Sequence, residues 1–152
     1  MTNNSFTTRP VHKIRVILFA LTVLFFTVSC TKNNTPDIPI AQVPDTTAIL
    51  KYRGLFQPTS GINITGAAKV YLKNNIYQLG LDSFSVTNGP DLKVYLSKDY
   101  PPANFIILGP LQSISGFQLY MIPGEPDFSA YKYVLIHCQQ YNHLFGIAEL
   151  NP

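Results

Sequence analysis

Hydrophobic and polar positions alternate along most of the chain from about residue 46 to the end. Every second residue between Ile64 and Leu72 is apolar or small, and the same period of two returns between Leu92 and Leu96. No stretch of a dozen residues in this region has the three-to-four-residue spacing of an amphipathic helix. Because strict alternation is typical of strands with one face in a core, the pattern predicts an all-β domain.

Turn residues divide this region into about eight short segments. The expected strands cover residues 52–56, 64–72, 77–86, 92–96, 105–108, 117–122, 133–139 and 145–150. Lys73-Asn74-Asn75 predicts a hairpin turn because Asn tolerates positive φ, and a slip in the alternation at Ser83 predicts a β-bulge. Short strands at this spacing are typical of a sandwich or a barrel, and we expect an antiparallel β-sandwich.

The first 30 residues follow a different pattern. A polar stretch ends in the basic run His12-Lys13-Ile14-Arg15, and an almost purely apolar run follows over residues 16–29. That run is shorter than the roughly 20 residues of a membrane-spanning helix, and a basic start before a short apolar run is typical of a secretory signal. Cys30 follows small residues directly, so the segment resembles a bacterial lipoprotein signal, with Thr27 where an aliphatic residue is usual. The alternatives are an ordinary cleaved signal and an uncleaved anchor.

These patterns divide the chain into three parts. We expect a lipoprotein signal peptide at residues 1–29, a lipidated Cys30 with a flexible Pro- and Asn-rich tether up to residue 47, and a β domain at residues 48–152. Acyl chains on Cys30 would hold the protein on a membrane. Because Thr31 rather than Asp follows the cysteine and no acidic cluster comes after it, we expect the bacterial outer membrane, facing the periplasm.

The charge of the chain narrows the range of partners. The formal net charge of +3 comes from 11 Lys and Arg against 8 Asp and Glu, but three of the basic residues lie in the first 15 positions. The remaining chain is balanced in charge, which excludes the broad basic surface that binds a phosphate backbone. We therefore expect no nucleic-acid partner. A hydrophobic content of 46% with many aromatic residues also argues against intrinsic disorder.

Cys138 is the one thiol that remains once Cys30 is lipidated. On a strand, Cys138 shares its face with Val134 and Ile136, so its side chain is expected to point into the core. Cysteine is often fully buried as a structural residue, and a lone thiol in an oxidising compartment can also bind a ligand or pair with another molecule. Both interpretations stay open from these residues alone.

The chain contains few other groups for chemistry. A blue-copper site would need Cys138, His137, His143 and Met121, but neighbouring strand residues such as His137 and Cys138 point to opposite faces, so we predict no such metal site. Most acidic residues of the domain lie beside turn residues, where capping explains them. The sequence has no Cys-x-x-Cys pair, phosphate-binding loop or Gly-x-Ser-x-Gly elbow, so we do not expect a stand-alone enzyme.

Two stretches resemble a known family. The first is Asn88–Ser97 (NGPDLKVYLS); the second begins at Gly116-Phe117-Gln118-Leu119-Tyr120, continues through Val134-Leu135-Ile136-His137-Cys138 and ends at Phe145–Leu150 (FGIAEL). Their order and content resemble the DM-thirteen (DM13) family of electron-transfer domains, over about residues 52–150, a family that occurs alone in bacterial lipoproteins. The resemblance implies an all-β fold and redox chemistry at Cys138, which matches the family's cysteine, although the family commonly has Trp where this chain has His137.

The resemblance implies a membrane-anchored envelope protein with a redox or electron-transfer role centred on Cys138. The thiolate would ligate a haem or a metal, with His143 as a further candidate ligand, or would exchange disulfides with a redox partner. The alternative is a non-catalytic envelope module that binds a protein or a glycan through aromatic residues of one sheet, with a structural cysteine. We thus expect the membrane and an envelope protein as partners.

Overall fold

The structure, a computed structural model, describes residues 40–41 and 46–152. The predicted signal peptide, the predicted lipidation residue Cys30 and most of the predicted tether lie outside these residues. Among the described residues, no helix has the length and apolar character needed to cross a membrane.

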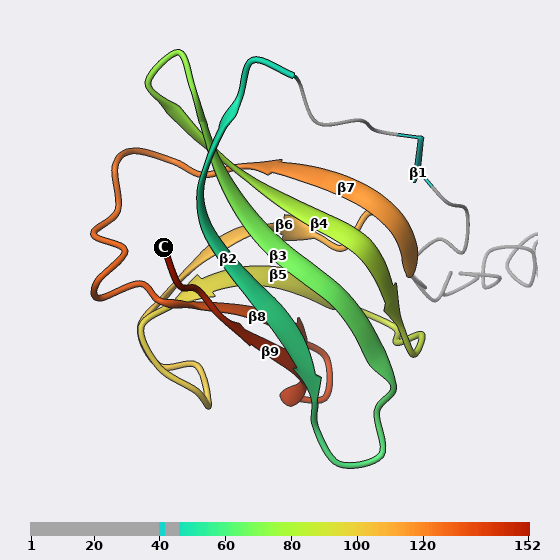
Figure 1. Ribbon diagram of the computed structural model, residues 1–152. Helices are drawn as coiled ribbons and strands as arrows, with labels where there is room; N and C mark the ends of the chain where they lie inside the picture. Colours follow the sequence, from blue (N-terminus) through green and yellow to red (C-terminus); the bar gives the residue numbers. More distant parts are fainter. Residues whose placement is uncertain (1–39, 42–45) are drawn as a thin grey trace, which may run out of the picture. The chain divides into compact units, whose positions relative to one another are not determined.

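Within the described residues the chain forms strands and no helix (Figure 1). The strands are β1 (Ile40–Ala41), β2 (Ile49–Pro58), β3 (Ile64–Lys73), β4 (Ile76–Val86), β5 (Leu92–Ser97), β6 (Phe105–Pro110), β7 (Ser115–Met121), β8 (Tyr133–Cys138) and β9 (His143–Glu149). Strands β2 to β9 pair with one another in antiparallel orientation and correspond to the expected eight, so the all-β prediction is confirmed.

The sequence did not predict β1. This two-residue strand pairs in parallel with β7, with Ile40 opposite Gly116 and Ala41 opposite Phe117, inside the segment that the sequence assigns to the tether. Two residues are too few for alternation to be recognised, and the prolines around them favour a tether interpretation.

One continuous sheet builds the domain, with the strand order β1-β7-β4-β3-β2-β9-β8-β5-β6. β2 pairs with β3 over most of its length and with β9 through Phe56, Gln57 and Pro58, so it belongs to both halves of the sheet. The halves lie face to face around one core (Figure 1). The fold therefore has the two layers of a sandwich, but the layers are joined through β2 in a nearly closed barrel.

The inward faces are those that alternation predicts. Val134, Ile136 and Cys138 of β8 are each 0% exposed and belong to the central hydrophobic cluster. The predicted hairpin turn is confirmed by positive φ angles of 48° at Asn74 and 62° at Asn75. The predicted bulge is confirmed by a register shift between β4 and β7 around Ser83, whose φ is 49°.

Candidate functional site

Cys138 lies at the end of β8, where its side chain is fully buried in the core. Leu92 is its register partner on β5, and His143 is its register partner on β9. Side chains directly opposite each other on antiparallel strands point to the same face, with Cβ atoms about 4.5–5.5 Å apart. The structure therefore brings together Cys138 and His143, the two residues that the sequence analysis proposed as candidate ligands.

The two segments that carry the family resemblance meet at this point. Leu92, of the Gly-Pro-Asp-Leu stretch, is opposite Cys138, and the carbonyl oxygen of Asp91 accepts a 2.9 Å hydrogen bond from the backbone N–H of Gln139. A Cβ on Gly89 would lie 2.9 Å from Leu92 and 3.0 Å from Phe145, so this turn packs tightly on both side chains. We call residues 89–92, 137–138 and 143–145 together the cysteine end of the barrel.

His137 points to the opposite, outer face of the sheet, as the alternation predicts. The residue is nevertheless only 5% exposed, and its ring stacks on Tyr95 of β5 with 5.3 Å between ring centroids. Its Nδ1 is buried and has no hydrogen-bond partner. Burial lowers the pKa of His137 below its ordinary value, the nearby His143 lowers it further, and a hydrogen bond with the Asn142 side chain acts in the opposite direction. The ring is therefore neutral at pH 7.

The residues at the cysteine end do not fit a metal centre or a haem. Met121 lies at the end of β7, 53% exposed, with its sulfur accepting a hydrogen bond from Gln78, and His137 is on the other face of β8. Among the described residues there is no group of three or more His, Cys, Asp or Glu side chains that could hold a metal ion. Cys138 and His143 alone are fewer donors than the three or four that zinc and copper centres use. The fully buried thiol also has no open face against which a macrocycle could lie.

Five acidic residues of the described domain, Asp82, Asp91, Asp99, Asp127 and Glu149, are engaged in turns or ion pairs. Asp99 accepts hydrogen bonds from the backbone of Ala103 and Asn104, and Asp127 accepts them from Ser129, so capping is confirmed at these two positions. Hydrogen bonds to the carboxylates, chiefly from the side chains of Asn104 and Ser129, lower the pKa of Asp99 and Asp127. Ion pairs join Lys69 to Asp82, Lys93 to Asp91 and Lys132 to Glu149.

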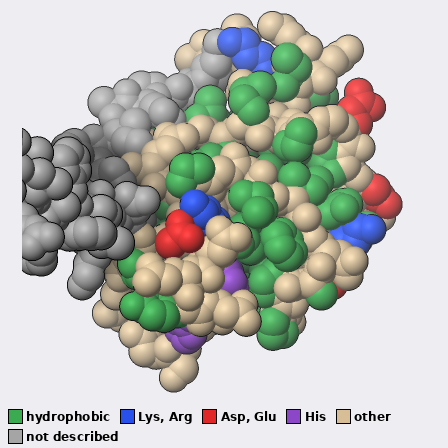
Figure 2. Space-filling model, turned by 180° about the vertical axis from the view of Figure 1, so that it is seen from behind, with side chains coloured by type: hydrophobic (Ala, Val, Ile, Leu, Met, Phe, Trp, Pro, Cys, Tyr) green, Lys and Arg blue, Asp and Glu red, His purple; other side chains and the backbone are tan. Residues whose placement is uncertain are grey.

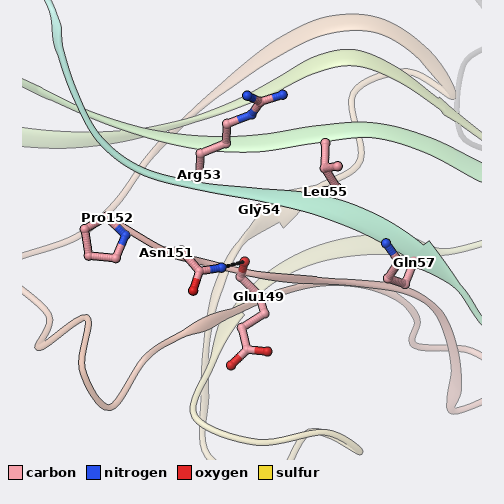
Figure 3. A pocket seen from close by; sticks show the side chains of 7 residues that line it. All are labelled: Arg53, Gly54, Leu55, Gln57, Glu149, Asn151 and Pro152. Carbon is pink, nitrogen blue, oxygen red and sulfur yellow. Dashed lines mark hydrogen bonds between the residues drawn. The ribbon is translucent and has the colours of Figure 1, made fainter.

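A surface pocket of about 550 Å³ lies at the opposite end of β9 from His143. Its lining residues are Arg53, Gly54, Leu55, Gln57, Glu149, Asn151 and Pro152 (Figure 3). The side chains of Arg53 and Glu149 point away from each other, and Glu149 pairs with Lys132 instead, at 3.5 Å (Figure 3). The pocket is thus separated from the cysteine end by the length of a strand.

The outer face of β5, β6 and β8 carries a group of apolar side chains. Tyr95 and Leu135 are 2% and 0% exposed although they point away from the main core, and their neighbours Phe105 and Ile107 on β6 are 38% and 48% exposed. Tyr95 stacks on Phe105 with 4.4 Å between ring centroids. We call Tyr95, Phe105, Ile107 and Leu135 the outer-face patch; Figure 2 shows that hydrophobic side chains gather on this side of the domain.

One of the comparisons with known proteins identifies a family. The model of the family described as electron transfer DM13 matches residues 56–150, which include β3 to β9 and the whole cysteine end. The chain belongs to the electron transfer DM13 family, and the resemblance seen in the sequence is confirmed. No curated protein and no solved structure matches the chain.

The sequence points to Cys138 and His143, and it brings in His137 only as a ligand of a blue-copper site that strand geometry argues against. Alternation places His137 on the outer face but does not predict that it is buried there. The signal in the sequence for the burial of His137 is the presence of aromatic residues at alternate positions of neighbouring strands. Only the strand order shows that Tyr95 stacks on the His137 ring.

Proposed function

We propose that this chain is a lipid-anchored electron-transfer protein of the cell envelope, in which Cys138 exchanges disulfides with a partner protein. The observation that carries the proposal is the meeting of the two family segments at Cys138, with Leu92 on one side and His143 on the other. The donor set supports exchange over ligation, because one thiol and one imidazole are enough for exchange but too few for a metal centre.

The reaction would be a thiol–disulfide exchange. The Cys138 thiolate attacks one sulfur of a partner disulfide, a bond forms between the two proteins, and the partner's own S–S bond breaks. Cys138 is thereby oxidised to a mixed disulfide, while the leaving partner sulfur takes the electron pair and a proton. Because Cys138 is 0% exposed, the exchange requires the cysteine end to open locally.

Glutathione disulfide tests this proposal. The purified full chain is incubated under native conditions with a series of glutathione disulfide concentrations. The modification of Cys138 is then measured by peptide mass spectrometry. We expect a mixed disulfide at Cys138 that grows with the oxidant and is reversed by dithiothreitol. A thiol that stays unmodified in the native protein and reacts only after unfolding in urea would show that Cys138 is structural.

The membrane anchor is a separate part of the proposal, supported by the signal pattern and by the position of Cys30. The full chain expressed in bacteria should partition into the detergent phase of an extraction, and Cys30→Ser should move it to the aqueous phase. Equal partitioning of the two chains would contradict lipidation at Cys30.

The outer-face patch favours a second candidate function, a non-catalytic binding module. Phe105 and Ile107 are well exposed on an edge strand, and apolar surface of this kind often marks an interaction site. Cross-linking in intact cells can compare Ile107→Lys with Cys138→Ala. A cross-linked product that is lost with Ile107→Lys and kept with Cys138→Ala supports the binding module, and the reverse result supports the exchange reaction.

A further inference from the structure

His137 is buried in a position that has no place for a second proton on its ring. The ring stacks on Tyr95 of β5, and Tyr95 in turn stacks on Phe105 of β6. The Nδ1 atom is buried and has no hydrogen-bond partner. A protonated imidazole has two N–H donors and a charge, so protonation here would bury an unpaired donor together with an uncompensated charge.

The groups that face His137 compensate that charge only in part, because the Asn142 side chain favours the protonated ring while burial and His143 oppose it. From β5, Lys93 is its register partner, and the carboxylate of Asp91 is already paired with Lys93 at 2.8 Å. From the turn and β9, its neighbours are the Asn142 amide, the His143 imidazole and the register partner Leu144. Tyr95 offers a ring face, and its pKa is raised, first by burial and then by Asp91, so its hydroxyl is neutral. The immediate surroundings thus hold a lysine and a second histidine.

The position of His137 couples its ring to the buried thiol. His137 and Cys138 are consecutive residues at the end of β8, with side chains on opposite faces. Cys138 pairs with His143, and the turn between them supplies Asn142, which bonds to His137. An opening in which the His137 ring moves to water together with the turn that carries Asn142 would uncover Cys138.

We propose that His137 is a pH-sensitive switch that keeps Cys138 covered at neutral pH and uncovers it when the ring is protonated. This inference concerns access to the Cys138 thiol, and its biological meaning rests on the proposed disulfide exchange. The lowered pKa of His137 agrees with opening upon protonation, because the closed state binds the proton more weakly than an open state does.

The test measures how strongly the fold protects Cys138 as the pH changes. The purified full chain is treated with dithiodipyridine, which reacts with thiols in mild acid as well as at neutral pH, and labelling of Cys138 is followed by peptide mass spectrometry, so that Cys30 does not contribute. Dividing the rate for glutathione by the rate for Cys138 at each pH removes the intrinsic pH dependence of thiol chemistry. The resulting protection factor reports the opening alone.

We expect the protection factor to fall, by up to about thirtyfold, between about pH 7.5 and about pH 5, because an open-state histidine with an ordinary pKa is protonated in that interval. His137→Phe keeps a ring that can stack on Tyr95 but cannot titrate, and it should make the protection factor independent of pH. His137→Gln provides a second variant without titration, in case the phenyl ring does not pack. The matched control Tyr141→Phe, in the turn between β8 and β9, should keep the pH dependence, because Tyr141 is 69% exposed.

The outcomes separate this proposal from the exchange reaction. A protection factor that does not change with pH in the natural chain, or that changes equally in both His137 variants, overturns the switch. Acid-dependent labelling of Cys138 without any mixed disulfide with glutathione at any pH supports the switch and contradicts the exchange reaction. Acid-dependent labelling together with a mixed disulfide supports both.

Discussion

The buried polar residues of this domain differ in how completely they are bonded. The Gln118 side chain is 0% exposed, and both of its polar atoms have partners. His137 is 5% exposed and has one nitrogen without a partner. Leaving a buried polar atom unpaired costs about 1–3 kcal/mol, so a fold keeps such an atom only where other contacts offset that cost. This contrast separates a structural amide from a histidine that can respond to its environment.

Gln118→Leu should destabilise the domain by about 2–4 kcal/mol, since the mutation leaves several buried donors without an acceptor. The Gln118 amide oxygen accepts hydrogen bonds from the backbone N–H groups of Gln112 and Ser113 and from the Tyr120 hydroxyl, while its nitrogen donates to the Ser113 carbonyl at 2.7 Å. Urea denaturation at neutral pH gives the change in the free energy of unfolding. The matched control is Gln57→Leu, at an exposed position, which should change it by less than about 0.5 kcal/mol.

His137 should also make the stability of the whole domain depend on pH. Its pKa is lower in the folded chain than in the unfolded chain, so the unfolded state binds more protons, and stability must fall as the pH drops below about 6.5. The maximal slope for one histidine is about 1.4 kcal/mol per pH unit. Urea denaturation at several pH values should show this loss in the natural chain and a smaller loss in His137→Phe. Equal slopes in the two chains would mean that His137 is not the group responsible.

At the scale of strands, the sequence determines much of the fold but not the partners of each strand. Alternation predicts which residues of β5 and β8 face the core, and the pair of asparagines predicts the turn between β3 and β4. The sequence does not predict that Leu92 lies opposite Cys138, because strand order depends on contacts between residues far apart in the chain. For the same reason the burial of His137 on an outer face could not be predicted, since it depends on side chains that β5 and β6 contribute.

The β3–β4 hairpin supplies a prediction at this scale. Asn74 and Asn75 have φ angles of 48° and 62°, the conformation of a type I′ turn, in which Asn-Gly is the preferred pair. Asn75→Gly should therefore leave the domain as stable or stabilise it by up to about 1 kcal/mol, and Asn75→Val should destabilise it by about 1–2 kcal/mol. Thermal unfolding followed by circular dichroism measures both. A valine variant as stable as the glycine variant would contradict the turn conformation.

For the whole molecule, the decisive element is β2, which joins the two halves of the sheet. Arg53 exchanges two backbone hydrogen bonds with Asn151, and regular pairing with β9 resumes at Phe56 opposite Ala148. Between these points β2 and β9 approach so closely that a Cβ on Gly54 would lie 2.3 Å from the carbonyl oxygen of Glu149. Glycine at this position is therefore a condition for closing the two layers into one barrel.

Gly54→Ala should destabilise the domain by about 3 kcal/mol or more, because the clash is with backbone atoms and β2 or β9 must shift to relieve it. Since β9 also carries His143, a shift transmitted along this strand should raise the rate at which Cys138 reacts with a thiol reagent at neutral pH. The control is Gly124→Ala, where φ is +66° and nothing lies within 4 Å of the added Cβ, so that only backbone strain of about 1–2 kcal/mol is expected. Urea denaturation and thiol labelling of the same two variants give both quantities. If Gly54→Ala is no more destabilising than Gly124→Ala, β2 and β9 do not approach as closely as the structure shows. If Gly54→Ala is destabilising but Cys138 stays protected, the two ends of β9 behave independently.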